Sequence, residues 1–355
     1  MYLNYGIIGS PNVGKSTLFN AITNSNVDAK NYQFCTIKPN FSAVKILDQR
    51  ILKLSKTIRS NKIYQSSINF TDIAGIIKNS NKGLGMGNEF LSNIKKTDII
   101  IHVVRCFKDK NIINSLSIVD PINEIKIIET ELILSDLQMA RKLFYNKEKN
   151  NFEKNILNKI IIHLSKFKCL SSLLNISYKE KKYINNSIFI TSKKKIYIGN
   201  MKDSYFFSNF LLDNLNRFSI KNNIFTFSIC SLLEYNITFL LNKIKYLFIN
   251  NTIKNSILEK INIKIFKLIK IYTFFSLRSK KISSWNIKKN TKSLDAAKKI
   301  HTDFRNGFIK VKVISYKDYV KLNKEEKIKK IGKIRYEGKS YVIKDGEIIE
   351  FLFKI

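Results

Sequence analysis

The sequence predicts an α/β protein with a mostly parallel sheet, a helical insertion and a small β-rich C-terminal domain. Three observations support this fold class. Short apolar runs alternate with helical patterns over the first half of the chain. A long middle stretch has the apolar spacing of helices, with neither glycine nor proline. The last part of the chain holds short apolar runs separated by turn residues.

The apolar runs of the first half predict individual strands, several of them buried on both faces. They lie at 5–9, 41–47, 67–72, 98–105, 195–200 and 224–231. Helical patterns follow the first run and precede the fourth, and this β–α–β order implies parallel neighbours. A further helix is predicted over 233–249.

The helical stretch, about 122–190, predicts one or two long helices, which we interpret as a hairpin inserted into the α/β domain. From about Tyr272 onward, short strands and one helix predict a separate domain. Within it, "KDG" at 344–346 lies between two apolar runs and predicts a hairpin. We therefore expect two domains, 1–271 and 272–355.

The charge balance is extreme, with 63 lysine and arginine residues against 27 aspartate and glutamate residues and a formal net charge of +36. RNA or the ribosome would explain this charge better than a membrane. An A/T-biased gene, rich in Lys, Asn and Ile codons, would explain it equally well, so charge alone does not establish RNA binding. The four cysteines are scattered without zinc or disulfide spacing, and no apolar run approaches ~18 residues. We therefore expect a soluble protein of the cytoplasm.

The strongest motif is "GSPNVGKSTLFNA", which begins at Gly9 directly after the first predicted strand. Its spacing, Gly9-x-x-x-x-Gly14-Lys15-Ser16, is that of a phosphate-binding loop between a strand and a helix. The glycines let backbone N–H groups face phosphate oxygens at a helix N-terminus, whose dipole favours anions. We expect Lys15 to reach the β- and γ-phosphates and Ser16 to bind Mg²⁺, with Thr17 beside it.

Two further segments fit the same chemistry. "FTDIAG" places Asp72 at a strand end, where it can hold magnesium through water, and Gly75 where its N–H can contact the γ-phosphate. "NYQFCTIKPN" supplies Thr36, which would complete the metal shell when a triphosphate is bound.

Two later strand ends carry a base-reading pattern. Asn200, Met201 and, three residues after the asparagine, Asp203 follow one strand. Cys230 and Ser231 follow the next, where backbone amides can contact a purine carbonyl. In this order, the motifs describe a G-domain of the P-loop GTPase superfamily.

Several blocks are closer to one family. "GSPNVGKSTLFNA", "NYQFCTIKPN", "DIAGIIKNSNKGLGMGNEFL", "HVVRCF" and "AAKKIHTDFRNGFIKVKVISYKDYV" strongly resemble the YchF family, also called Obg-like ATPases. The likeness covers most of the chain and is weakest over the helical insertion. It implies an OBG-type G-domain with a coiled-coil insertion and a C-terminal TGS domain of the β-grasp type. It also implies ribosome association and a role around translation or stress.

The resemblance also implies roles for individual residues. Asn12, Val13, Gly14, Lys15, Ser16 and Thr17 would surround the phosphates, with Ser16, Thr36 and Asp72 on Mg²⁺. Asn12 resembles an asparagine that helps hold K⁺ in related G-domains, so K⁺ is a further hypothesis. The position that holds a water-orienting glutamine in Ras-like proteins is Ile76, which implies slow intrinsic turnover. Asn114 matches a position where some members carry histidine; asparagine can orient water but does not accept a proton near neutrality.

The sequence contains features that favour ATP and one that favours GTP. A standard guanine reader has lysine directly after the asparagine, whereas here Met201 follows Asn200 and the lysine is Lys202. The family's pattern ends in glutamate and implies ATP, yet Asp203 restores the shorter carboxylate that guanine prefers. We favour ATP on family grounds and keep GTP open.

The leading hypothesis is a ribosome-associated nucleotide hydrolase that acts as a switch, with ribosomal RNA and protein as partners. One alternative is a GTP-preferring G protein. Another is an RNA- or ribosome-binding module that holds nucleotide with negligible hydrolysis. No membrane partner and no DNA specificity are expected, and a metabolic kinase would need an acceptor site that the sequence does not suggest.

Overall fold

The computed structural model describes residues 3–24, 41–46, 48–60, 62–73, 86–109, 112, 118–146, 148–202, 209–244, 257–278, 281–301, 303–304 and 307–354. These residues form two compact units. The first unit takes its residues from 3–44 and 69–252, and the second from 45–68 and 253–354.

The first unit contains a six-stranded sheet in the order β2-β4-β1-β5-β6-β7. Its strands are β1 (Leu3–Ile8), β2 (Phe41–Lys45), β4 (Ser67–Asp72), β5 (Ile99–Arg105), β6 (Lys194–Asn200) and β7 (Phe225–Ile229). The pairs β1–β5, β5–β6 and β6–β7 are parallel, and every residue of β5 is buried. The predicted α/β class and parallel sheet are confirmed.

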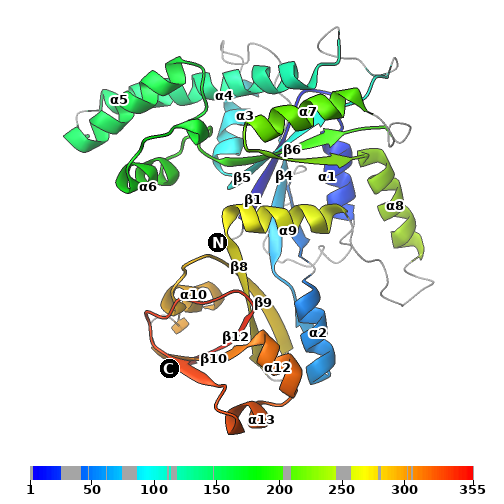
Figure 1. The fold of residues 1–355 in the computed structure, drawn as a ribbon, viewed down its shortest axis with the longest axis vertical. Coiled ribbons are helices and arrows are strands. Elements are labelled where there is room, and N and C mark those ends of the chain that lie inside the picture. Colours follow the sequence, from blue (N-terminus) through cyan, green and yellow to red (C-terminus); the bar gives the residue numbers. More distant parts are fainter. Residues whose placement is uncertain are drawn as a thin grey trace. The chain divides into compact units, whose positions relative to one another are not determined.

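Helices cover this sheet (Figure 1). They are α1 (Lys15–Asn24), α3 (Met86–Lys95), α4 (Pro121–Phe144), α7 (Phe210–Lys221) and α8 (Ser231–Ile244). Helix α1 packs against α8 and β1, and α4 packs against β5 and α7. None of the helices in the described ranges has both the length and the apolar character that a membrane crossing needs.

Between β5 and β6 the chain continues from α4 into α5 (Asn151–Ser165), a short 3-10 helix η2 (Leu170–Ser172) and α6 (Tyr178–Asn186), and the interpretation of this stretch as an inserted hairpin stays a prediction. Helices α4 and α5 pack against each other around a hydrophobic cluster that includes Ile133, Leu157 and Phe189. Capping boxes at Asn150 and Ser177 begin α5 and α6, because each side chain accepts a backbone N–H of the first turn.

The second unit is built on another six-stranded sheet, in the order β11-β10-β12-β8-β9-β3. Its strands are β3 (Lys62–Tyr64), β8 (Ile271–Arg278), β9 (Lys281–Lys288), β10 (Phe308–Ser315), β11 (Arg335–Glu337) and β12 (Glu347–Phe353). Its helices are α2 (Gln49–Ile58), α9 (Ile257–Ile269), α10 (Ser293–Ile300), α12 (Tyr316–Leu322) and α13 (Glu325–Lys330). The pairs β8–β9, β10–β11 and β10–β12 are antiparallel, which confirms a β-rich C-terminal part.

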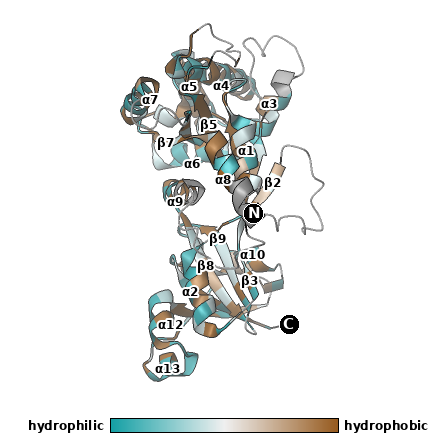
Figure 2. Ribbon diagram, turned by 90° about the vertical axis from the view of Figure 1, so that its right-hand side faces the viewer, coloured by the Kyte–Doolittle hydropathy of each residue, from teal (hydrophilic) through white to brown (hydrophobic). Residues whose placement is uncertain are grey.

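Helix α2 and strand β3 fold with this C-terminal sheet, although the sequence places them between two strands of the first unit. The apolar side of α2, with Ile51 and Leu54, packs in one cluster with Phe275 and Ile282. Figure 2 shows α2 beside the strands of this sheet. Strand β3 pairs in parallel with β9. The unit therefore includes residues well before 272, and the boundaries 1–271 and 272–355 stay a prediction.

The predicted hairpin at 344–346 is wrong. A turn does form there, with Gly346 at φ 82°, but the residues before it do not pair with β12. Instead Val342 bridges to Lys292. The cause is the Asp345 carboxylate, which accepts the Thr273 N–H at 2.8 Å and forms an ion pair with Arg50 at 2.7 Å.

Candidate functional site

The phosphate-loop motif lies where β1 ends and α1 begins, as predicted. Gly9 and Gly14 have φ values of 154° and 95°, which side chains on L residues rarely allow. A Cβ at Gly9 would overlap the Val103 carbonyl, and one at Gly14 would overlap the Asn200 amide. Both glycines are therefore required for the loop to lie this close to its neighbours.

Lys15 is the first residue of α1, and only 8% of it is exposed. Its Nζ donates to the Ser10 carbonyl oxygen at 2.6 Å, so the ammonium folds back over the loop. Burial lowers the pKa of Lys15, while the carboxylates of Asp72 and Glu124 oppose that effect. The loop thus encloses one desolvated cation, as phosphate binding requires.

Ser16 and Asp72 meet at the mouth of this loop. The Ser16 hydroxyl donates to Asp72 Oδ2 at 2.7 Å, while Asp72 Oδ1 is buried and has no hydrogen-bond partner among the described residues. Burial raises the pKa of Asp72, against the effects of Ser16 and Lys15. A hydroxyl and a carboxylate with an unused oxygen are hard oxygen donors of the kind Mg²⁺ prefers, so the residues fit the ion.

Asn200, at the end of β6, lies behind the loop and is buried. Its Nδ2 donates to the Val13 carbonyl oxygen at 2.8 Å, and its Oδ1 accepts the Ser231 N–H at 2.9 Å. Its backbone carbonyl accepts the Cys106 N–H at 2.8 Å. The residue predicted to read the base therefore also ties the phosphate loop to β5 and α8.

The two residues after Asn200 differ in environment. Met201 is buried and donates its N–H to the Ile229 carbonyl at 2.8 Å. Lys202 forms an ion pair with Asp109, with 3.1 Å between Nζ and Oδ2. Lys202 is thus held by an ion pair with the segment that follows β5.

Cys230 and Ser231 lie at the junction of β7 and α8, both buried. The Ser231 hydroxyl has no hydrogen-bond partner within the described part of the chain, and it lies 3.9 Å from a Cβ built on Gly14. The structure thus brings Val13, Gly14, Asn200 and Ser231 together. Asn12 and Thr17 lie in the same loop and first helical turn. Thr36, Gly75, Ile76, Asn114 and Asp203 lie outside the described residues.

Sequence reasoning missed two buried charges beside this site. Arg105, at the end of β5, donates to the carbonyl oxygens of Phe107 at 3.1 Å and Asp109 at 3.2 Å, so it holds the segment after the strand. Glu124, in the first turn of α4, is 2% exposed. A signal for Glu124 did exist, because it lies four residues before Ile128 and eight before Leu132, on the buried stripe of α4.

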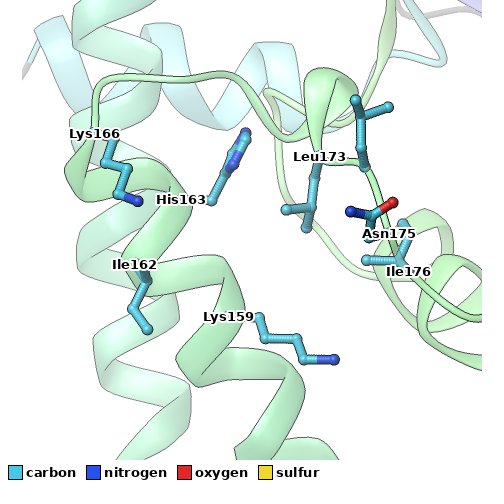
Figure 3. A pocket seen from close by; sticks show the side chains of 8 residues that line it. Lys159, Ile162, His163, Lys166, Leu173, Asn175 and Ile176 are labelled. Atoms are coloured by element: carbon cyan, nitrogen blue, oxygen red, sulfur yellow. The ribbon is translucent and has the colours of Figure 1, made fainter.

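A surface hollow of about 260 Å³ lies on the helical insertion, and its lining includes none of the predicted site residues. Figure 3 shows its lining of Lys159, Ile162, His163, Lys166, Leu173, Leu174, Asn175 and Ile176. Lys159 is paired with Glu180 at 2.7 Å, and His163 contacts the Cys169 carbonyl at 3.0 Å. Since the phosphate-loop motif is not part of this lining, we do not assign the nucleotide to this hollow.

Comparison with known proteins agrees with the site. Residues 4–162 match a family described as "50S ribosome-binding GTPase", and residues 271–354 match the YchF-GTPase C-terminal family, described as "Protein of unknown function". The chain is 42% identical over 362 residues to "Ribosome-binding ATPase YchF" of Buchnera aphidicola subsp. Schizaphis graminum, covering 99% of both chains. It is 35% identical over 359 residues to the protein of that name from Shigella flexneri, again with 99% of both covered.

A solved structure described as the Schizosaccharomyces pombe YchF GTPase is also similar. It matches with a TM-score of 0.82 and 29% identity, covering 99% of this chain and 97% of that one. The fold is therefore that of a YchF protein over nearly the whole length of the chain. From its sequence relatives, its fold and its phosphate loop, the chain belongs to the YchF family of P-loop nucleoside triphosphatases.

Proposed function

We propose that this chain binds a purine nucleoside triphosphate with Mg²⁺ at its phosphate loop, hydrolyses it, and works on the ribosome in the cytoplasm. The observation that carries the proposal is the bond from the Ser16 hydroxyl to Asp72 at the end of β4, directly after the buried Lys15 that begins α1. The printed names of the relatives, ribosome-binding ATPases, support both the reaction and the partner.

Each residue of the loop has a separate task in this proposal. Lys15 would leave the Ser10 carbonyl and turn to the β- and γ-phosphates, while the N–H groups at the start of α1 bind the remaining oxygens. Ser16, Asp72 and Thr36 would hold Mg²⁺, which neutralises charge on the phosphates when it is bound. Asn12 would help hold K⁺ beside them.

For hydrolysis, we assign the γ-phosphate contact to the Gly75 N–H and the orientation of the attacking water to Asn114. Ile76 cannot orient water, and Asn114 cannot accept its proton near neutrality. We therefore expect slow intrinsic turnover that a partner or K⁺ raises. Bound nucleotide with no turnover under any such condition would identify a nucleotide-binding module instead.

ATP is the substrate that we favour. Met201 stands where a guanine reader has lysine, and Lys202 is already paired with Asp109. Asp203 and the Ser231 hydroxyl, which has no hydrogen-bond partner among the described residues, would contact the base edge. Calorimetric affinities for ATP and GTP, measured side by side with magnesium and potassium, test this assignment, and tighter binding of GTP would overturn it.

The proposal is tested first by Lys15→Ala. Loss of the buried ammonium should abolish hydrolysis and weaken triphosphate binding by about tenfold or more, because a charge-assisted contact contributes about 1.5–3 kcal/mol. Lys179→Ala is the matched control, since Lys179 is exposed on α6 in the same unit. Undiminished nucleotide binding by Lys15→Ala would refute the site.

The ribosomal partner is tested by sedimentation of the purified protein with ribosomes in a series of nucleotides and salt concentrations. We expect co-sedimentation that depends on the nucleotide and weakens as salt rises, because the chain carries a net charge of +36. Protein that stays at the top of the gradient in every nucleotide state at low salt would refute this partner.

A further inference from the structure

The surface hollow on the helical insertion has no part in the proposed mechanism, yet it has two walls of different origin. One wall is a single face of α5 and its C-terminal end, because its residues follow at helical spacing: Lys159, Ile162, His163 and Lys166. The other wall is the segment 173–176 between η2 and α6. Figure 3 shows the side chains of α5 on one side of the hollow and those of the segment on the other.

Polar contacts and packing hold both walls in place. His163 Nε2 donates to the Cys169 carbonyl oxygen at 3.0 Å, which joins the end of α5 to the start of η2. Lys159 pairs with Glu180 at 2.7 Å, which joins α5 to α6. Two side chains of the segment 173–176 pack against the hydrophobic cluster between α4 and α5. The hollow is therefore preformed, and a ligand would not have to order its walls.

The hollow presents large aliphatic side chains to solvent. Ile162 is 51% exposed and Leu174 is 79% exposed, and both belong to the lining. Its volume of about 260 Å³ lies below the ~300–1,000 Å³ that is usual for sites of small organic ligands. A partner protein needs less room, because one or two inserted side chains can supply most of its binding energy. Size and exposure therefore favour a segment of a protein over a free small molecule.

The surroundings of the hollow are basic. Residues 151–190 contain seven lysines and only two glutamates. Both glutamates, Glu153 and Glu180, are already paired with lysines of the insertion. Lys166 is exposed and forms no ion pair with the described residues. A partner that complements this surface carries negative charge beside its apolar side chain.

The lining favours a peptide over a nucleic acid. Single-stranded RNA is bound largely by stacking its bases on aromatic side chains. Among the described residues that line the hollow, His163 has the only aromatic ring, and its Nε2 is used on the Cys169 carbonyl. The apolar part of the lining is aliphatic throughout and consists of Ile162, Leu173, Leu174 and Ile176. Such a lining accommodates an aliphatic side chain, whereas it offers no platform for a base.

We propose that this hollow is a docking site for an acidic peptide segment of a protein partner. The segment inserts an aliphatic side chain against Ile162 and Leu174 and places a carboxylate beside Lys166. The inserted side chain supplies most of the affinity, and the charges orient the segment and speed its association. The inference is independent of the phosphate loop, since none of that loop lines the hollow.

The test measures binding of labelled synthetic peptides to the full chain by fluorescence anisotropy at one fixed salt concentration. In the first set, two leucines, adjacent or one to three residues apart, lie among glutamates and glycines. In the second set, alanines replace the leucines. A chain of net charge +36 attracts any acidic peptide, so the second set measures this unspecific part. We expect members of the leucine set to bind at least about tenfold more tightly than their alanine counterparts.

Two exposed residues of the lining are then replaced. Ile162→Ala should weaken binding of the leucine peptides about tenfold, whereas Ile188→Ala, which changes an equally exposed isoleucine outside the lining, should not. Lys166→Glu should weaken binding more than Lys179→Glu, which makes the same change of charge on α6 outside the lining. Because all four side chains are exposed, the variants should fold, and circular dichroism checks this.

Three results would overturn the inference. The first is a wild-type chain that binds the leucine peptides no more tightly than the alanine peptides. The second is equal binding of the leucine peptides by Ile162→Ala and Ile188→Ala. The third concerns labelled oligouridylate as a second probe: if Ile162→Ala weakens its binding while no leucine peptide binds specifically, the hollow is a site for RNA instead. Unchanged oligouridylate binding by Ile162→Ala, together with weaker peptide binding, is the result that we expect.

Discussion

The side chain of Asn200 holds Val13 of the phosphate loop. Its amide nitrogen donates to the Val13 carbonyl oxygen at 2.8 Å, and its amide oxygen accepts from the Ser231 N–H. Both bonds are buried, and Gly14 packs directly on the same amide. The shape of the phosphate loop therefore depends on a residue that follows it by almost two hundred positions.

Asn200→Ala should weaken both stability and nucleotide binding. It leaves the buried Val13 carbonyl and the Ser231 N–H without partners, and each such group costs about 1–3 kcal/mol. We expect the free energy of unfolding, measured with urea, to fall by about 2–6 kcal/mol. The exposed Asn158→Ala on α5 is the control and should change little. Unaltered stability and nucleotide affinity in Asn200→Ala would show that the Asn200 side chain does not hold the phosphate loop in place.

Ser16→Ala should separate metal binding from phosphate binding. The Ser16 hydroxyl is paired with Asp72 and is exposed at the mouth of the loop, whereas the backbone N–H groups that would bind phosphate are unchanged in the variant. We expect affinity for the magnesium–nucleotide complex to fall by about tenfold to a hundredfold, with little change in affinity for nucleotide alone in EDTA. Calorimetry in both conditions checks this expectation, with Thr23→Ala at the end of α1 as control. An equal loss in the two conditions would count against a metal role.

The sequence predicted those parts of the molecule whose structure is set by interactions between residues close together in the chain. The spacing from Gly9 to Ser16 is set by one turn and one helix start, so the motif sufficed to place the loop. Asn200 and Ser231 lie together near the loop because the parallel strands β6 and β7 end at the same edge of the sheet, and their contact with the base stays a prediction. The interpretation of Asn200 was incomplete, since its bond to Val13 depends on the packing of residues far apart in the chain.

The parts that sequence reasoning missed depend on distant partners. The turn at 344–346 has hairpin residues, but Asp345 is bound by Thr273 and Arg50, which no local pattern reveals. Helix α2 shows an ordinary apolar stripe, and only the structure identifies the C-terminal sheet as the surface that it covers. Glu124 was overlooked because an acidic residue in a first helical turn is normally a solvated one.

Glu124→Gln should stabilise the folded chain at neutral and higher pH. The pKa of Glu124 is about 7 in the folded protein against an ordinary value of 4.5, so between these values the folded state binds more protons than the unfolded state. Stability is therefore lost as pH rises from about 4.5 to about 7, and the full loss of about 3 kcal/mol persists above that.

Urea unfolding of wild type and Glu124→Gln checks this expectation. The two proteins should be equally stable near pH 4.5, and the variant should be more stable at pH 8. Glu148→Gln, which changes an exposed carboxylate, should follow wild type throughout. A difference that does not vary with pH would show that Glu124 acts through packing alone.

The C-terminal sheet should need α2 for its stability, because Ile51 and Leu54 fill one face of it together with Phe275 and Ile282. Leu54→Ala should lower the free energy of unfolding of this unit by about 2–5 kcal/mol, as for other buried leucines. Lys53→Ala, on the exposed side of the same helix, should have little effect.

A fragment of residues 271–355 should unfold at a lower temperature than a fragment in which residues 45–68 are fused to it. The melting temperatures of the two fragments can be compared by circular dichroism. Equal melting temperatures for the two fragments would show that the sheet is complete without α2 and that a boundary near 272 separates two independent domains.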